Sequence, residues 1–402
     1  MSKSLGTLLF AGMLAMAGGP AFAEPVSLSD ALARGQEMSP RIATAKAELK
    51  AAEGRAVQAG VRPNPEVSVE VENFSGTGPY RTFRSTETTV SVAQPFELGG
   101  KRRARKEVAA AERDYARIAL RRAEADLAYD IVVAHAGLRA AEERADLARK
   151  GLARAVELAR IAETLVDVGR DPPLTKLRAD ALLAEARAEA LRTMSELLNA
   201  RQRLALLIGS DDGELSAEIG DMPMPPALPA DAQSLDERLA AAERDAASAR
   251  VRLAQAEGVP DVTASGGVRR FRESNDTAFL VSLSIPLPVF NRNRGNIHAA
   301  SAEGDAAEAR LAQSRLDTRY SRREAELLLA AANERLTALS GAGLFQANEA
   351  ARVAEIGYQQ GKFTLIELID AQEAQTGANL KLIEAQFDRA RALAALGRAN
   401  AQ

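Results

Sequence analysis

The stretch that decides the fold is VSVAQPFELGGKRRARKEV, residues 90–108. Its first residues alternate apolar and polar side chains, a pattern typical of a β-strand. We expect the strand to end near Pro95, and Gly99 and Gly100 then allow the chain to turn. Five basic residues follow between positions 101 and 106, where a long segment rich in Ala, Arg and Glu begins. The feature to be explained is therefore a short strand that leads directly into a very long helix.

The same pattern occurs twice, because residues 90–114 align without a gap with residues 281–305, at an offset of 191 positions. The matched pairs are Val90 and Val281, Ser91 and Ser282, Pro95 and Pro286, Lys101 and Arg292, Arg103 and Arg294, Ala109 and Ala300, Glu112 and Glu303, and Asp114 and Asp305. Further matches are Pro65-Glu66-Val67 with Pro260-Asp261-Val262, and GRDPPLTKL (169–177) with GKFTLIEL (361–368). Chance similarity in biased sequence is the alternative, but the paired prolines fall outside the biased regions. We therefore predict two tandem repeats.

These matches divide the chain into four predicted parts: a signal peptide (1–23), a first repeat (24–208), a Pro-rich acidic linker (209–233) and a second repeat (234–402). The signal peptide is indicated by Lys3, by an apolar run, and by Ala21-Phe22-Ala23 before Glu24. A buried N-terminal helix is the alternative for this segment. Because the sequence has no Cys, we expect neither disulfides nor a lipid-bearing Cys.

Each repeat is predicted to contain a helix, a β-hairpin and two long helices. The predicted ranges are helices 27–60 and 234–257, strands 65–72, 86–95, 260–270 and 277–286, long helices 101–166 and 293–358, and second helices 173–208 and 363–399. The hairpins thus span 65–95 and 260–286, and the long helices together span 101–208 and 293–399. Strands of about 10 residues have the length needed to cross an outer membrane at a tilt.

Aromatic residues gather near the predicted strands. Seven of them are Phe74, Tyr80, Phe83, Phe96, Phe271, Phe279 and Phe290. This distribution fits aromatic girdles at the two membrane interfaces. The alternative is an aromatic core for a small β domain.

The long helices set the scale of the molecule. A helix over residues 101–166 would extend about 100 Å, at 1.5 Å per residue. Its apolar residues Leu120, Leu127, Ile131 and Leu138 are spaced by seven, four and seven, as in a coiled-coil seam. Such a helix has to pack along partner helices over its whole length.

The predicted fold is mainly α with a small membrane β-barrel portion. Four strands cannot close a barrel, and unpaired strand edges are not tolerated in lipid. Several copies must therefore contribute strands to one barrel, and three copies would give twelve strands.

A basic cluster follows the turn at the start of the first long helix. Its members are Lys101, Arg102, Arg103 and Arg105. At the rim of a barrel they would lie near lipid phosphates. Cations at a helix start oppose the helix dipole, which suggests an anionic neighbour. A solvated basic face is the alternative.

Three segments resemble the TolC family of outer-membrane factors: QPFELGGKRRAR (94–105), LPVFNRNRGNIHAA (287–300) and IGYQQGKFTLIELIDAQ (356–372). The first two resemble the branch that serves heavy-metal RND (resistance-nodulation-division) pumps. The resemblance implies a homotrimer in the outer membrane lipid, with a shared twelve-stranded β-barrel. The long helical hairpins would form a trimeric α-barrel, which is a long tunnel in the periplasm. It also implies docking to a periplasmic adaptor and to an inner-membrane RND pump. The predicted function is therefore the exit duct of a tripartite efflux system for heavy-metal cations.

The resemblance places a periplasmic gate at Tyr358, Glu367 and Asp370. Phe363 stands where the best-known member of the family has a basic residue, so the ionic latch of that member between protomers is not carried over to this position. Glu367 and Asp370 are three residues apart and share a helix face. Threefold symmetry would bring six carboxylates around the axis, where they would attract cations and raise some pKa values. An ordinary solvated helix face is the alternative.

The two helical turnarounds are candidate docking sites for the adaptor. Their exposed tips are predicted at Gly169 and Arg170 in the first repeat and at Gly361 and Lys362 in the second. Glycine permits tight or left-handed turns, so a purely structural role is the alternative.

The sequence predicts no catalytic residues, no cofactor and no metal site, and hence no enzyme. His135 and His298 are isolated, and we expect His298 to be an exposed helix residue. Met222 and Met224 have no Cys or His neighbours that would complete a soft-metal site. A net charge of −3 and a pI near 5.8 do not favour nucleic acid as a partner.

Two other functions stay open at this point. A periplasmic adaptor or coiled-coil scaffold would also be exported and rich in helix, but an adaptor has one helical hairpin between β-rich domains. The same fold also serves drug efflux or type I protein secretion. Only the resemblance to the metal branch favours metal efflux over these.

Overall fold

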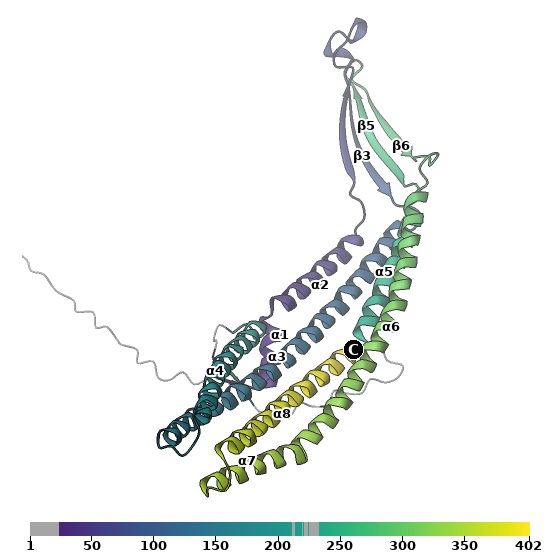
Figure 1. Ribbon diagram of the computed structural model, residues 1–402. Helices are drawn as coiled ribbons and strands as arrows, with labels where there is room; N and C mark the ends of the chain where they lie inside the picture. The colour runs from purple at the N-terminus through teal and green to yellow at the C-terminus, as the bar shows by residue number, and fades with distance from the viewer. Residues whose placement is uncertain (1–23, 211–213, 219, 221–223, 225–232) are drawn as a thin grey trace, which may run out of the picture.

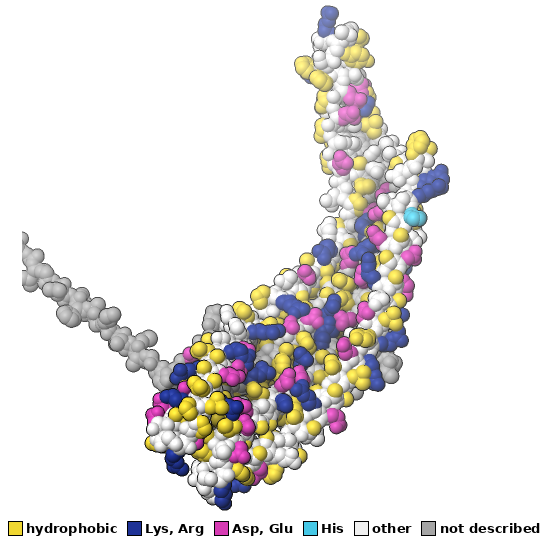
Figure 2. All heavy atoms as spheres, in the orientation of Figure 1, with side chains coloured by type: hydrophobic (Ala, Val, Ile, Leu, Met, Phe, Trp, Pro, Cys, Tyr) yellow, Lys and Arg dark blue, Asp and Glu magenta, His cyan; other side chains and the backbone are white. Residues whose placement is uncertain are grey.

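The computed structural model describes residues 24–210, 214–218, 220, 224 and 233–402. The predicted signal peptide (1–23) and parts of the linker, including Met222, lie outside the described residues. The chain is elongated, with a β-sheet at one end and two helical turns at the other (Figure 1). In Figure 2, charged side chains of both signs are distributed over the helices between these ends.

Each half of the chain contains an initial helical part, two sheet strands and a pair of long helices. The elements of the first half are β1 (Glu24–Val26), α1 (Leu28–Met38), α2 (Pro40–Ala59), β2 (Glu66–Glu72), the short turns η1 (Gly78–Tyr80) and η2 (Phe83–Ser85), β3 (Glu87–Phe96), α3 (Lys101–Asp167) and α4 (Pro173–Ile208). Those of the second half are β4 (Leu215–Ala217), α5 (Leu235–Glu257), β5 (Val262–Phe271), β6 (Thr277–Ser284), α6 (Arg294–Ala338), the π-helical turn η3 (Leu339–Gly343), α7 (Leu344–Gln359) and α8 (Leu365–Ala399).

Two predicted helices are interrupted. The helix expected over 27–60 is divided at Ser39, because Pro40 has no N–H to continue the first helix and disfavours helical geometry in the residue before it. The helix expected over 293–358 is interrupted by the π-helical turn η3 (Leu339–Gly343). Within this turn Gly341 has non-helical backbone angles (φ −84°, ψ −118°), which its missing side chain permits.

The 67-residue helix α3 is the central helix of the molecule. It packs against α2, α4, α5 and α8 and therefore contacts both halves of the chain. The predicted seam is confirmed: Leu127, Ile131 and Leu138 are buried in one core cluster, with Leu120 packed at its border. Close packing is possible because many of the buried helix residues are alanines.

Hydrogen bonds join the two halves near the middle of the molecule. β1 pairs in parallel with β4, so the start of the first half is bound to the segment that follows α4. Within the first half, the buried His135 donates from its Nε2 to the Val26 carbonyl at 2.9 Å and holds β1 against α3. The Leu235 N–H donates to the Ala401 carbonyl at 2.9 Å, which joins the start of α5 to the end of the chain.

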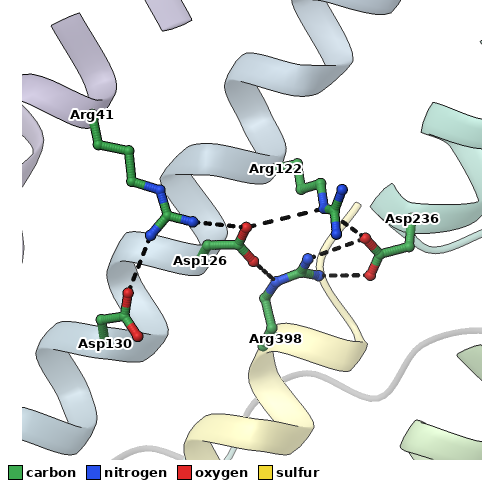
Figure 3. Close-up of polar contacts among 6 residues, drawn as sticks. All are labelled: Arg41, Arg122, Asp126, Asp130, Asp236 and Arg398. Carbon is green, nitrogen blue, oxygen red and sulfur yellow. Dashed lines mark hydrogen bonds and ion pairs between the residues drawn. The ribbon is translucent and has the colours of Figure 1, made fainter. Parts of the chain in front are cut away.

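An ion-pair network, which we call the equatorial network, joins four helices at the same level (Figure 3). Its members are Arg41 on α2, Arg122, Asp126 and Asp130 on α3, Asp236 on α5 and Arg398 on α8. Arg398 lies at its centre, with its side chain only 16% exposed. It donates to Asp126 and, through both terminal nitrogens, to Asp236 at 3.0 and 3.1 Å.

The other two arginines extend this network on both sides. Arg41 donates to Asp126 and Asp130, each at 3.1 Å, and the Arg122 Nε lies 2.8 Å from Asp236. Because Arg398 is mostly buried and bidentate, it contributes more than a surface ion pair does.

We predict that Arg398→Ala lowers the free energy of unfolding by about 2 kcal/mol, because it leaves Asp126 and Asp236 without their shared partner. Arg160→Ala is the matched control, since Arg160 forms only an exposed pair with Glu157 one turn away on α3. The control should change stability by less than about 0.5 kcal/mol. Chemical denaturation of the detergent-extracted protein measures both, and equal effects would contradict a central role for Arg398.

Candidate functional site

The four-stranded sheet has the order β2-β3-β5-β6, and every neighbouring pair is antiparallel. Residues directly opposite each other project to the same face. One such row is Val69, Val90, Val268 and Phe279, and the next is Val67, Val92, Gly266 and Val281. This face of the sheet is therefore apolar across all four strands.

The apolar face is uncovered within the chain. Phe279 is 86% exposed and Val281 is 90% exposed, and the valines of β2 are exposed as well. Phe74, Tyr80, Phe83 and Phe96, which the sequence placed in girdles or in a β core, are also exposed. A β core is therefore excluded for these four residues in the single chain. An exposed apolar sheet face of this length requires a nonpolar surrounding.

The opposite face of the sheet is mainly polar, with Phe271 and Leu280 also on it. Ser68 and Ser91 share a hydrogen bond of 2.7 Å across β2 and β3. Arg269 on β5 binds Glu72 at 2.8 Å and Glu87 at 3.0 Å, and it donates to the Thr89 hydroxyl at 2.8 Å. Alternation of an apolar and a polar face is typical of strands that line a water-filled barrel in a membrane.

The basic cluster after β3 is largely bound within the chain. Lys101 pairs with Asp261 at 2.7 Å, and Arg105 pairs with Glu97. The expected anionic neighbours of the helix start are thus Asp261 and Glu97.

Of the remaining members, Arg102 donates to the Gly60 carbonyl at the end of α2, at 2.7 Å. Arg103 is the most exposed and pairs only with Glu107 on the next turn. Contact of the cluster with lipid phosphates stays a prediction, and Arg103 is the member best placed for it.

Gly99 and Gly100 turn the chain from β3 into α3, with φ angles of +68° and +77°. A side chain at Gly99 would also collide with Val259, since a Cβ there would lie 2.6 Å from the Val259 Cβ. These glycines therefore provide both a left-handed conformation and a close approach between the two halves.

The helical turns at the far end share one C-cap geometry. Gly169 (φ +69°) and Gly361 (φ +72°) follow α3 and α7 in the left-handed region. In each turn the glycine N–H and the next N–H bond back to the last helical turn, which is the Schellman motif. The exposed residues Arg170 and Lys362 directly follow these glycines. The turns thus have a structural explanation, and their use in adaptor docking stays a prediction.

Phe363 packs onto the end of α7. A Cβ at Gly357 would lie 2.2 Å from the Phe363 ring, so the ring rests directly on this glycine. The turn is therefore closed by an apolar contact.

Glu367 caps the start of α8. Its carboxylate accepts from the Thr364 N–H at 2.7 Å and from the Thr364 hydroxyl at 2.9 Å. The Glu367 N–H donates to that hydroxyl, which completes a capping box. Bonds from Thr364 lower the pKa of the Glu367 carboxyl in the single chain. The raised pKa values expected for a ring of carboxylates concern three chains and stay a prediction.

The other two predicted gate residues lie on either side of this cap. Asp370 is exposed one turn further along α8. Tyr358 is half-buried against the core cluster formed by α3, α4, α7 and α8. Burial raises the pKa of the Tyr358 phenol, and the Asp171 carboxylate of the first turn raises it further. The structure thus brings the two turns, far apart in sequence, close together.

Sequence reasoning missed the equatorial network and the residues that bind the basic cluster. Both consist of residue pairs that are far apart in the chain. The sequence contained one signal for them, the alignment of Glu66 with Asp261, which is the partner of Lys101. His298 is exposed, as predicted. No group of three or more His, Cys, Asp or Glu residues within the described ranges is arranged to hold a metal ion. None of the helices described is both long and apolar enough to cross a bilayer.

A two-faced sheet joined to a long helical body is the architecture of an outer-membrane channel subunit. The model of the family "Outer membrane efflux protein" matches residues 29–210 and 230–401. These matches cover most of the sequence, and the chain therefore belongs to that family.

The relatives of the chain include metal-resistance proteins. The nickel-cobalt-cadmium resistance protein NccC of Alcaligenes xylosoxydans xylosoxydans is 33% identical over 382 residues, which cover 94% of this chain and 87% of that protein. The nickel and cobalt resistance protein CnrC of Cupriavidus metallidurans is 35% identical over 327 residues, or 77% of each. The solved outer-membrane channel OprN is 26% identical with a TM-score of 0.77, and the match covers 93% of this chain and 89% of that one.

These comparisons confirm the predicted family and the predicted location. The chain is an outer-membrane efflux channel whose long helices lie in the periplasm. The family consists of transport proteins and is not a family of enzymes.

We predict that Gly357→Ala destabilises the turn between α7 and α8 by about 1–3 kcal/mol, because its methyl group displaces the Phe363 ring. Gly377→Ala on α8 is the control, since no atom lies within 4 Å of the added Cβ. This control should be neutral or stabilising. Amide hydrogen exchange over residues 344–399 measures both, and unchanged protection in Gly357→Ala would contradict the packing described.

Proposed function

We propose that three copies of this chain form the exit duct of a tripartite efflux system that exports heavy-metal cations. The observation that carries the assembly is the four-stranded sheet, whose apolar face is exposed and whose outer strands β2 and β6 each have one unpaired edge. Lipid cannot satisfy the free N–H and C=O groups of those edges. Three sheets joined edge to edge make a closed barrel of twelve strands.

The helical body supports the same assembly. α3 would extend about 100 Å, at 1.5 Å per residue. Each chain contributes four long helical rods, which three copies arrange as a periplasmic tunnel continuous with the barrel. We propose that the turns at Gly169–Arg170 and Gly361–Lys362 contact the adaptor, which connects the duct to an inner-membrane RND pump.

The cargo is proposed from the relatives. NccC and CnrC are named for resistance to nickel and cobalt, and NccC also for cadmium. We predict that deletion of the gene lowers the tolerated concentration of nickel, cobalt, cadmium or zinc salts several-fold, and that the wild-type gene restores it. Growth on a panel of metal salts and of drugs measures this. Sensitivity to drugs alone would contradict metal export and favour drug efflux.

The gate at the periplasmic end is proposed from Tyr358, Glu367 and Asp370. We predict that Glu367→Gln with Asp370→Asn abolishes block of single channels by divalent cations, because it removes the six carboxylates proposed to surround the axis. Gln keeps the acceptor oxygen of the capping box, so the helix start is preserved. Replacing both residues with Ala should in addition raise the conductance.

Glu373→Gln is the control for this prediction, since Glu373 is exposed further along α8. Bilayer recordings with and without divalent salt compare the variants. Unchanged block in the double variant would show that these carboxylates do not line the gate.

A further inference from the structure

The two strand-to-helix junctions of the chain are equivalent in sequence but not in their surroundings. The first junction is residues 96–101 and the second is residues 287–292, aligned by the offset of 191 positions. Both are held on one side by the helix of their own repeat. In the first, Arg102 beside it donates to the Gly60 carbonyl at 2.7 Å. In the second, Asn293 beside it donates to the Ala254 carbonyl on α5, also at 2.7 Å.

The other side of the first junction is covered by the second repeat. Asp261, just before β5, accepts from the Leu98 N–H at 3.1 Å and from Lys101 at 2.7 Å. Gly99 lies against Val259 in the same contact. This contact continues the β3–β5 pairing, in which Phe96 is opposite Val262.

The other side of the second junction is open. Leu287 is 80% exposed and Phe290 is 99% exposed. Arg292, the counterpart of Lys101, bonds only to the nearby Pro288 carbonyl, at 3.2 Å. Within the described parts of the chain it has no carboxylate partner. The junction thus presents a cation and apolar side chains at the free edge of β6.

The matching anion lies at the opposite edge of the sheet. Glu66, the first residue of β2, is the sequence counterpart of Asp261. It is exposed and has no cationic partner among the described residues. One chain therefore has an unpaired anion at its β2 edge and an unpaired cation at its β6 edge.

We propose that Glu66 of one copy pairs with Arg292 of the neighbouring copy and repeats between chains the Lys101–Asp261 contact found within each chain. This inference rests on the proposed assembly and specifies its seam. We assume that β6 pairs with the β2 of a neighbouring copy in the same register in which β3 pairs with β5. The alignment of the repeats then places Glu66 of that neighbour beside Pro288 and Val289. The neighbour then covers Leu287 and Phe290. Six equivalent joints, three within chains and three between them, surround the rim of the barrel.

Charge reversal tests this pair. Glu66→Arg alone and Arg292→Glu alone should each raise the protein concentration needed for half-assembly by about 10-fold or more, and the double variant should restore assembly. Glu273→Arg, in the β5–β6 turn away from both edges, is the control and should assemble as the wild type does. Native mass spectrometry in detergent measures the trimer fraction.

Cysteine cross-linking provides a second readout. Because the sequence has no Cys, Glu66→Cys with Val289→Cys introduces a single possible pair. Oxidation should yield covalent trimers, and either single variant should not. Two results together would overturn the pairing but leave the assembly intact: trimers form but the two cysteines do not cross-link, and the charge reversals neither weaken nor restore trimer formation. Lipid would then cover the second junction. A wild-type protein that is not trimeric would overturn the assembly itself.

Discussion

The structure depends on the need to satisfy backbone hydrogen bonds inside a lipid bilayer. Within one chain the four strands form three hydrogen-bonded pairs, β2–β3, β3–β5 and β5–β6. One edge of β2 and one edge of β6 have no partner strand. In water these edges would bind solvent, but lipid provides no donors or acceptors. The exposed apolar face is not suited to contact with water. The opposite face, with Arg269, Glu72 and Glu87, is not suited to contact with lipid, so the sheet cannot have lipid on both of its faces. A barrel shared among chains satisfies all three conditions.

The two halves of the chain have the same order of elements and contact each other at both ends of the long helices and between them. The junction between β3 and α3 is completed by Asp261 of the second half, so the two halves meet beside the sheet with a defined charge pair. Further down, the equatorial network around Arg398 fixes α2, α3, α5 and α8 at one level. At the far end, two Schellman turns reverse the helices with the same backbone geometry. Only the turns repeat one device in both halves, while the junction contact and the equatorial network join the halves to each other, and the long helices run side by side along the molecule (Figure 1).

Local patterns in the sequence predicted most of the elements. The alternation in Val67, Val69 and Val71, and the glycines before Lys101, indicate strands and a turn because these signals depend on neighbouring residues alone. Pro40 is a local signal of the same kind and explains the break at Ser39 within the predicted helix 27–60. The interruption at Leu339–Gly343 has weaker signals, since Gly341 and Gly343 are tolerated within helices at a modest cost.

The contacts that position the candidate sites were harder to predict. Glu367 is predicted to be a gate carboxylate, and the structure adds that Thr364, three residues before it, forms a capping box with it, which the sequence pattern also permits. The partners of Lys101 and Arg398 are separated from them by more than a hundred residues. Spacing along the chain carries no direct information about such pairs. The alignment of the two repeats is the exception, because it transfers a contact seen in one half to the other.

Hydrogen exchange at the sheet edges tests the central claim most directly. The account predicts that, in the detergent-extracted wild-type protein, the outward-facing amides of β2 and β6 are protected as strongly as those of the inner strands β3 and β5. Rapid exchange at these two edges, in a stable species of single-chain mass, would contradict a barrel shared among copies.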